Sequence, residues 1–287
     1  SASSATSGYQ YLTILNGKSA HVNSSGTSTE FVDVIPTIPN KDFSNYSQEK
    51  LAAYLKKRTG HNEFKITPYT HGATTVSNAY STGIYSPTQH RIYLIPRNQG
   101  AQTNWHYIDC SDGSIVAYAH GATLNGTSPY MGGCYSPTQN RIYLAPNYQS
   151  NQADWHYIDC DTGLVVAYTT GLASVANASA YNGAIYSPKQ NRIYFAPYHQ
   201  AHYKEDWHYI DCSDGSVVAY AHGFALNSIQ FFAYLGGVYS PTQDRIYFVP
   251  YYQGTESTFH YVDCSDGSIV AYTNTTNIVR YGYFGGV

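Results

Sequence analysis

The sequence predicts an all-β fold built from repeated four-stranded antiparallel units, and three observations support this prediction. A segment of about 50 residues occurs four times, read from Tyr85, Tyr135, Tyr186 and Tyr239. Each copy contains four short runs of β-branched and aromatic residues that are separated by turn residues. Aromatic residues make up 16% of the 287 residues and charged residues only 11%, a composition that excludes a disordered chain.

The second repeat shows how one unit is organised. Its expected strands are Gly132–Tyr135, Arg141–Ala145, Trp155–Cys160 and Leu164–Tyr168. Ser-Pro-Thr-Gln-Asn separates the first two strands and Asp-Thr-Gly the last two, as tight hairpin turns require. Four antiparallel strands in a unit of this length are typical of a β-propeller blade. The repeats therefore predict four blades, at about 80–121, 130–171, 181–223 and 234–273.

The two ends of the chain predict a further blade that they share. At the C-terminal end, Tyr283–Val287 repeats the first strand of the fourth unit. At the N-terminal end, we assign the second, third and fourth strands to Tyr9–Leu15, Glu30–Val34 and Phe64–Gly72. Closing a ring in this way removes the exposed sheet edges that otherwise invite aggregation.

These assignments give a complete fold prediction. We expect a single domain over residues 1–287, a five-bladed β-propeller of four-stranded antiparallel blades. The composite blade that closes the ring consists of residues 9–72 and 277–287.

A helical insertion is expected inside the composite blade, at about 40–61. Within it, Ser44–Arg58 reads as a helix because Leu51, Tyr54 and Leu55 form an apolar stripe at helical spacing. The stripe favours packing on the propeller rim, and docking of a partner is the alternative.

The repeat resembles a known family. The order Ser-Pro-x-x-Asn-Arg-Ile-Tyr-Leu-Ala-Pro, followed by Tyr-Ile-Asp-Cys-Asp-Thr-Gly-Leu-Val-Val-Ala-Tyr, is similar to the YVTN-type β-propeller repeat. The resemblance extends from Tyr85 to Tyr283 and implies a propeller fold in an extracellular or surface-layer setting. It implies no site residues.

Several polar side chains recur in every repeat, and we interpret them as structural. An arginine opens each second strand, and an aspartate lies near the end of the adjacent third strand, so that the two can pair across the strands. The arginines are Arg91, Arg141, Arg192 and Arg245, and the aspartates are Asp109, Asp159, Asp211 and Asp263. Histidines recur in each third strand, at His106, His156, His208 and His260. They lack the close spacing of metal ligands, which favours hydrogen-bonded structural histidines over a metal site.

Four of the five cysteines, Cys110, Cys160, Cys212 and Cys264, occupy one equivalent position of the repeats. Equivalent positions of successive blades lie too far apart for disulfide bonds, so we expect buried thiols there. Strand tyrosines such as Tyr93, Tyr143 and Tyr194 are expected to pack between blades.

The sequence contains few residues that could form a catalytic site. The expected innermost strands carry no acidic residue, although glycosidases built on propellers need carboxylates facing the central funnel. The sequence has neither a GxSxG nucleophile elbow nor a glycine-rich phosphate loop. We therefore predict that the protein is not an enzyme and uses no catalytic residue, cofactor or metal.

Binding is better supported, on one face of the expected ring. The loops that join second to third strands, and those that join successive blades, share what we call the long-loop face; the short hairpin turns share the opposite turn face. Long-loop segments are polar and aromatic, a chemistry that suits sugars and protein partners. Candidate ligand-binding residues are Gln99, Gln149, Gln200, Gln253, Tyr130, Tyr148, Tyr181, Tyr203, Tyr252 and Tyr281.

Two functions remain open at this point. The first is a non-enzymatic recognition module that binds glycans multivalently, with one weak site per blade. The alternative is a structural subunit of an extracellular or virion assembly, such as a filament, surface layer or capsid, whose partners are neighbouring protein subunits or copies of itself. A net charge of −3 argues against nucleic acid as a partner, and no apolar run is long enough for membrane insertion.

The expected localisation is extracellular, at the cell surface or in a virion. The chain begins at Ser1 without an initiator Met, which suggests a processed end. Five asparagines lie in glycosylation sequons: Asn23, Asn45, Asn125, Asn177 and Asn274.

Overall fold

The computed structural model describes thirteen stretches of the chain: residues 10–14, 18–22, 30–33, 73, 75–98, 102–122, 128–148, 154–170, 179–199, 206–221, 232–252, 258–273 and 283. The chain divides into two compact units, Ser1–Thr70 with Val287, and His71–Gly286. Every regular element among the described residues is a β-strand, and none of these residues belongs to a helix that could span a bilayer. The helix expected at Ser44–Arg58 lies outside the described residues.

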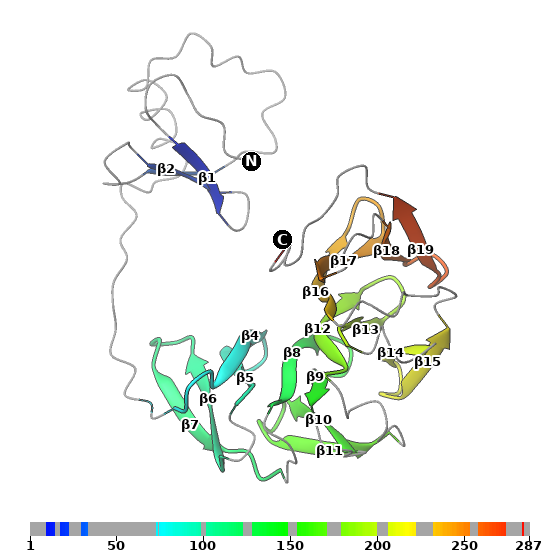
Figure 1. Ribbon diagram of the computed structural model, residues 1–287. Helices are drawn as coiled ribbons and strands as arrows, with labels where there is room; N and C mark the ends of the chain where they lie inside the picture. The colour runs from blue at the N-terminus through cyan, green and yellow to red at the C-terminus, as the bar shows by residue number, and fades with distance from the viewer. Residues whose placement is uncertain are drawn as a thin grey trace. The chain divides into compact units, whose positions relative to one another are not determined.

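The larger unit contains one four-stranded antiparallel sheet for each repeat, with the strands in chain order (Figure 1). The first sheet has β4 (Tyr80–Ser86), β5 (Arg91–Pro96), β6 (Asn104–Asp109) and β7 (Ile115–Ala119). The second has β8 (Ser128–Ser136), β9 (Arg141–Tyr148), β10 (Asp154–Asp159) and β11 (Val165–Thr169). The third has β12 (Tyr181–Ser187), β13 (Arg192–Pro197), β14 (Asp206–Asp211) and β15 (Val217–Ala221). The fourth has β16 (Phe232–Ser240), β17 (Arg245–Tyr252), β18 (Thr258–Asp263) and β19 (Ile269–Thr273).

The turn residues of the repeat explain where the strands end. In the second sheet, Asn140 closes the β8–β9 hairpin with a left-handed φ of 52°, which asparagine tolerates better than most residues. Gly163 closes the β10–β11 hairpin at φ 78°, and its N–H donates to the carbonyl oxygen of Asp159 over 2.7 Å. The Asp159 carboxylate in turn accepts the N–H of Asp161 over 3.0 Å. The repeated turn sequences therefore set the strand bounds, as the sequence predicts.

Neighbouring sheets pack face to face, and their first strands β4, β8, β12 and β16 contact one another in that order, as in propeller blades. Trp155 and Tyr143 of the second sheet pack against Phe195, Ile193 and Ile210 of the third. All five side chains are at most 1% exposed. This confirms that strand tyrosines fill the space between sheets, and the same positions recur at the other two seams.

Glycines let the first strands approach one another closely. A Cβ atom on Gly132 would lie 2.8 Å from the Cα of Gly183 in the next sheet, which is closer than such atoms can come. Gly132 also has φ 88°, a conformation that favours glycine. In the same way, a Cβ atom on Gly183 would lie 3.0 Å from the Cα of Gly236, so the close contact is repeated from sheet to sheet.

The first sheet of this stack is less buried than the sheets that follow it. Ile142, Ile158 and Cys160, which face the preceding sheet, are at most 1% exposed. Their equivalents Ile92 and Ile108 in the first sheet are only half-buried, and Cys110 is exposed. The prediction of buried thiols is thus confirmed at Cys160, Cys212 and Cys264, whereas Cys110 is exposed because no described residue packs there as a preceding repeat would. All five cysteines are free.

The smaller unit contains a three-stranded antiparallel sheet of β1 (Gln10–Ile14), β2 (Lys18–Val22) and β3 (Glu30–Asp33). Lys18 lies opposite Asp33 in the β2–β3 pair, just as Arg141 lies opposite Asp159 in β9 and β10. In this sheet β2 lies between β1 and β3, so β1, which overlaps the expected strand Tyr9–Leu15, pairs with β2 and not with β3. A polar Lys-Ser-Ala-His-Val segment carries too little hydrophobic pattern to be recognised beforehand. Phe64–Gly72 lies outside the described residues, as does most of 277–287.

We expect the substitution Gly132→Ala to destabilise the protein strongly, because the added Cβ would meet the Gly183 backbone and φ would remain positive. The matched control is Gly113→Ala, where φ is similarly 79° but a Cβ would meet nothing within 4 Å. The control should cost about 1 kcal/mol of unfolding free energy, and Gly132→Ala at least about 2 kcal/mol more. Urea denaturation would measure both, and equal costs would show that the first strands are not in close contact.

Candidate functional site

A cavity of about 240 Å³ opens on the long-loop face of the larger unit. Its lining comes from the ends of second strands and the starts of first strands in all four repeats. The lining residues are Arg97, Ser128, Met131, Asn147, Tyr148, Ser179, Tyr198 and Phe232. No single repeat supplies the whole site, so the cavity exists only because the sheets are stacked.

Backbone hydrogen bonds fix the residues around this cavity. The Arg97 N–H donates to the carbonyl oxygen of Ala79 at 2.7 Å, which ties the end of β5 to the segment before β4. Between sheets, the carbonyl oxygen of Asn147 accepts the Ala180 N–H at 3.3 Å. The Asn147 side-chain amide donates to the Tyr181 carbonyl oxygen at 2.8 Å. The lining is therefore held by the main chain of adjacent repeats and is largely preorganised.

Aromatic rings form part of the cavity wall. Tyr148 at the end of β9 is 42% exposed, an unusual value for a tyrosine in this stack. Tyr198 and Phe232 are half-buried, and their ring centroids lie 4.7 Å apart with an angle of 32° between the planes. Tyr251 extends this group, with its centroid 6.3 Å from that of Tyr198. The wall thus presents flat apolar surfaces whose edges carry hydroxyl groups.

Charge is distributed differently on the two faces. On the turn face, carboxylates such as Asp109 and Asp263 accept hydrogen bonds from the N–H and hydroxyl groups of the serines two residues later. These hydrogen bonds lower the pKa of both carboxyl groups. On the long-loop face, the exposed Arg97 is the charged residue of the cavity lining, and the other lining side chains are neutral.

The structure places the candidate binding residues in different environments. Tyr148 lines the cavity, as expected for a ligand contact. Tyr130 and Tyr181 are not loop residues: they begin or lie within β8 and β12, and both are 0% exposed, so the expectation of an exposed ligand contact is wrong for them. Tyr252 ends β17, where only its backbone is described. The remaining candidates lie outside the described residues: Gln99, Gln149, Gln200, Gln253, Tyr203, Tyr281 and the sequon residues Asn23, Asn45, Asn125, Asn177 and Asn274.

Sequence reasoning missed most of the cavity lining, although a signal was present. Each second strand has a proline at or near its end, and the residue that follows this proline differs between repeats: Arg97, Asn147, Tyr198 and Tyr251. The proline is the same in all four repeats, and the residue after it is not. At this position the repeats therefore share a backbone conformation, while their side chains can have different roles. Three of these four residues line the cavity.

The repeated histidines are structural, as the sequence predicts. The hydroxyl groups of Tyr80, Tyr181 and Tyr234 lie 2.5 Å from Nδ1 of His106, His208 and His260. Tyr130 makes the same hydrogen bond to His156. All four histidines are buried. No metal-binding cluster is found among the residues that the structure describes.

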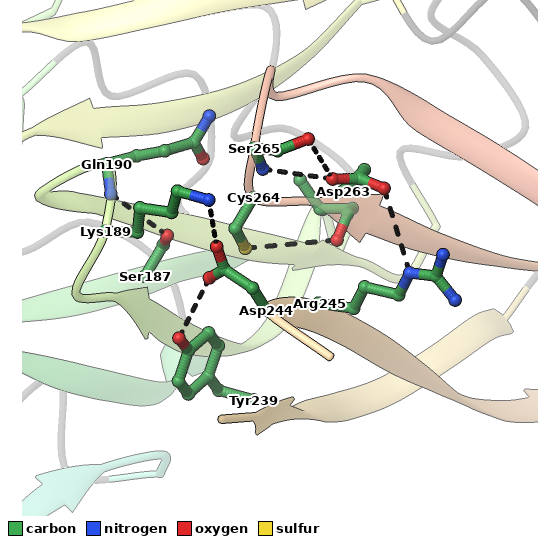
Figure 2. Close-up of polar contacts among 10 residues, drawn as sticks. Ser187, Lys189, Gln190, Tyr239, Asp244, Arg245, Asp263, Cys264 and Ser265 are labelled. Carbon is green, nitrogen blue, oxygen red and sulfur yellow. Dashed lines mark hydrogen bonds and ion pairs between the residues drawn. The ribbon is translucent and has the colours of Figure 1, made fainter. Parts of the chain in front are cut away.

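The repeated arginines and aspartates are opposite each other in every sheet, as predicted. Figure 2 shows the pair at the seam of the third and fourth sheets, where Arg245 Nε lies 3.7 Å from Asp263 Oδ2. Each arginine also lies over a tyrosine ring: Arg245 lies 4.4 Å from the ring centroid of Tyr261, and the other three repeat this arrangement. A second ion pair, between Lys189 and Asp244 at 2.7 Å, joins the two sheets (Figure 2).

No family model matches the chain, and no curated protein matches its sequence. Among solved structures, the chain is similar to the extracellular domain of a one-component system from B. thetaiotaomicron, at 7% identity and a TM-score of 0.49 over 96% of this chain. It is also similar to the WD40 repeats of RRP9, at 8% identity and a TM-score of 0.44 over 68% of this chain. A third is PorZ, a surface component of the type-IX secretion system of Porphyromonas gingivalis, at 10% identity and a TM-score of 0.42 over 71%. The chain spans 31%, 51% and 24% of the lengths of these three chains.

Acid should destabilise the protein through His156. Burial lowers the pKa of this imidazole from 6.5 to about 4. Because the folded-state pKa lies below the unfolded one, the unfolded chain takes up the proton first as the pH falls through 6.5. Between pH 7 and pH 5 we expect a loss of about 2 kcal/mol of unfolding free energy from this group.

Chemical denaturation at the two pH values would measure the loss. His156→Gln, which cannot titrate, is the matched variant and should show a shallower dependence on pH. The aspartates with lowered pKa values, such as Asp263, titrate below this interval. If the unfolding free energies of the wild type and of His156→Gln changed equally with pH, a neutral buried His156 would be contradicted.

Proposed function

We propose that this protein is a non-enzymatic recognition module that binds glycans through its long-loop face. The observation that carries the proposal is the cavity itself, which residues of all four repeats line and which combines aromatic rings with amide and hydroxyl groups. Sugars present apolar C–H faces and many hydroxyl groups, so they need flat apolar surface and neutral hydrogen-bonding groups side by side. Tyr148, Tyr198 and Asn147 supply that combination.

The volume of the cavity limits the size of the ligand. Pockets for drug-sized ligands have volumes of about 300–1,000 Å³, and this cavity has about 240 Å³. It therefore suits one sugar residue, for example the end of a glycan chain. Additional sites at the loop glutamines would make binding multivalent, and this part of the proposal rests on the sequence.

We further propose that the chain closes into a five-bladed ring, with the smaller unit as the core of the fifth blade. Two observations support closure. The first sheet leaves Ile92 and Cys110 less buried than their equivalents in the later sheets. The register of Lys18 with Asp33 follows that of the arginine–aspartate pairs. A fifth blade, completed by strands from both ends of the chain, would cover this surface.

The setting proposed for such a module is extracellular, at a cell surface or in a virion, with glycosylation at the sequons. The low content of charged residues and the resemblance to surface-layer propeller repeats support this setting. Neighbouring subunits of an assembly are the alternative partners for the same face. A chain that polymerises and binds no sugar would favour this alternative.

Glycan binding can be tested by titrating the protein with a panel of mono- and oligosaccharides at millimolar concentration. We expect Tyr148→Ala to weaken binding about tenfold, because the loss of one stacking ring is worth about 1.4 kcal/mol. Leu164→Ala is the control, since Leu164 is 57% exposed in a hairpin turn of the opposite face. Absence of any binding, or equal affinity of the wild type and Tyr148→Ala, would overturn the proposal.

Ring closure predicts slow chemical modification of Cys110. A fifth blade would cover this thiol as the first sheet covers Cys160, which is 1% exposed. Native maleimide labelling followed by peptide mass spectrometry would compare the two cysteines within one sample. Rapid labelling of Cys110 alone would argue against a blade at this position.

A further inference from the structure

We propose that the cavity on the long-loop face selects sugars that carry a carboxylate, and that Arg97 binds this group. The inference rests on the proposed glycan-binding function and specifies its ligand class. It is carried by the position of one cation in an otherwise neutral site.

Arg97 is placed so that its charge is available to a ligand. The residue is exposed and lines the cavity, while its N–H is anchored on Ala79. Among the described residues, ion pairs join Lys189 to Asp244 and Arg245 to Asp263, both on the turn face. Arg97 forms no ion pair with any carboxylate that the structure describes, so its guanidinium keeps its capacity for an anion.

The other arginines of the repeats have a different role, which sets Arg97 apart. Arg91, Arg141, Arg192 and Arg245 each lie over a tyrosine ring at 4.2 to 4.4 Å from its centroid. They open the second strands at the turn face, whereas Arg97 follows the end of a second strand. The equivalent positions in the other repeats hold Asn147, Tyr198 and Tyr251, so the cation is present once in the described part of the site.

The neighbouring groups suit the remainder of a sugar acid. Asn147, which is 4% exposed, donates one amide hydrogen to the Tyr181 carbonyl oxygen, and this bond fixes the orientation of the amide in the cavity wall. Ser128 and Ser179 add hydroxyl groups that donate or accept. The ring of Tyr148 offers a face for the C–H groups of the sugar.

A carboxylate matches this arrangement because a guanidinium can donate two parallel hydrogen bonds to its two oxygens. The strength of such a contact in an exposed site depends on salt, since mobile ions screen it. A neutral sugar offers the Arg97 guanidinium only uncharged oxygen acceptors, which form weaker hydrogen bonds than a carboxylate does. The site should therefore discriminate between an acidic sugar and its uncharged analogue of the same shape.

The test compares glucuronic and galacturonic acids with glucuronamide and galacturonic acid methyl ester, which keep the shape and lose the charge. Calorimetric titration of the full chain should show at least tenfold tighter binding of the acids, with an advantage that shrinks as salt is raised. Arg97→Gln should abolish this advantage, so that acids and neutral analogues bind this variant equally, and Arg97→Lys should keep part of the advantage. Lys189→Gln removes an equal charge from the turn face and should change none of these affinities.

The outcomes separate the inference from the proposed function. Equal affinity of the wild type for acids and neutral analogues would overturn carboxylate selection and leave glycan binding in place. An acid preference that survives in Arg97→Gln, or that is lost equally in Lys189→Gln, would also overturn it. Tighter binding of glucose 6-phosphate than of glucuronic acid would overturn the assignment to a carboxylate. Failure to bind any sugar would contradict the proposed function itself.

Discussion

The packing of one sheet against the next is the interaction on which the rest of this structure depends. Each seam buries a large aromatic residue, such as Trp155, against isoleucine and phenylalanine side chains of the following sheet. Burial of one such side chain is worth about 1.5–3 kcal/mol, and the same positions recur at every described seam. The first strands can come close enough only because glycines such as Gly132 present no side chain there. This packing fixes the ends of the second strands, and those ends carry the cavity.

The polar side chains of the two faces differ in whether they form hydrogen bonds and ion pairs within the protein. On the turn face, Asp263 accepts hydrogen bonds from Ser265 and Asp244 accepts one from Tyr239 and pairs with Lys189, so that these groups are satisfied within the protein (Figure 2). Such networks hold turns and seams together and leave little capacity for a ligand. On the long-loop face, the backbone is satisfied by bonds between repeats, whereas the side chains of Arg97 and Tyr148 are exposed. A function is therefore better sought where the main chain is fixed and the side chains remain available.

The sequence predicts well the features that all four repeats share, and it predicts poorly those that occur outside the repeats or differ between them. Strands, hairpins, the pairing of arginine with aspartate and the structural histidines all follow from a local pattern that occurs four times. The sequence predicts the first strand of the second repeat only from Gly132, whereas β8 begins at Ser128, and the burial of Tyr130 depends on the neighbouring sheet. The strand β2 at Lys18–Val22 is not predicted, because it lacks the apolar residues of the repeats. The pattern marks the position of Arg97 as variable between repeats, but the surroundings that make it part of a cavity come from other repeats.

The repeats also explain why a single asymmetric site is a reasonable outcome of a symmetric fold. If every repeat placed the same residue after its second-strand proline, the long-loop face would carry identical weak sites. Instead, Arg97, Asn147 and Tyr198 differ in charge, hydrogen bonding and apolar surface while their backbones are held in equivalent ways. Different side chains on equivalent backbone positions converge on one cavity, where each contributes a separate kind of contact. The fold thus supplies rigidity through what the repeats share, and specificity can arise only from the few positions at which they differ.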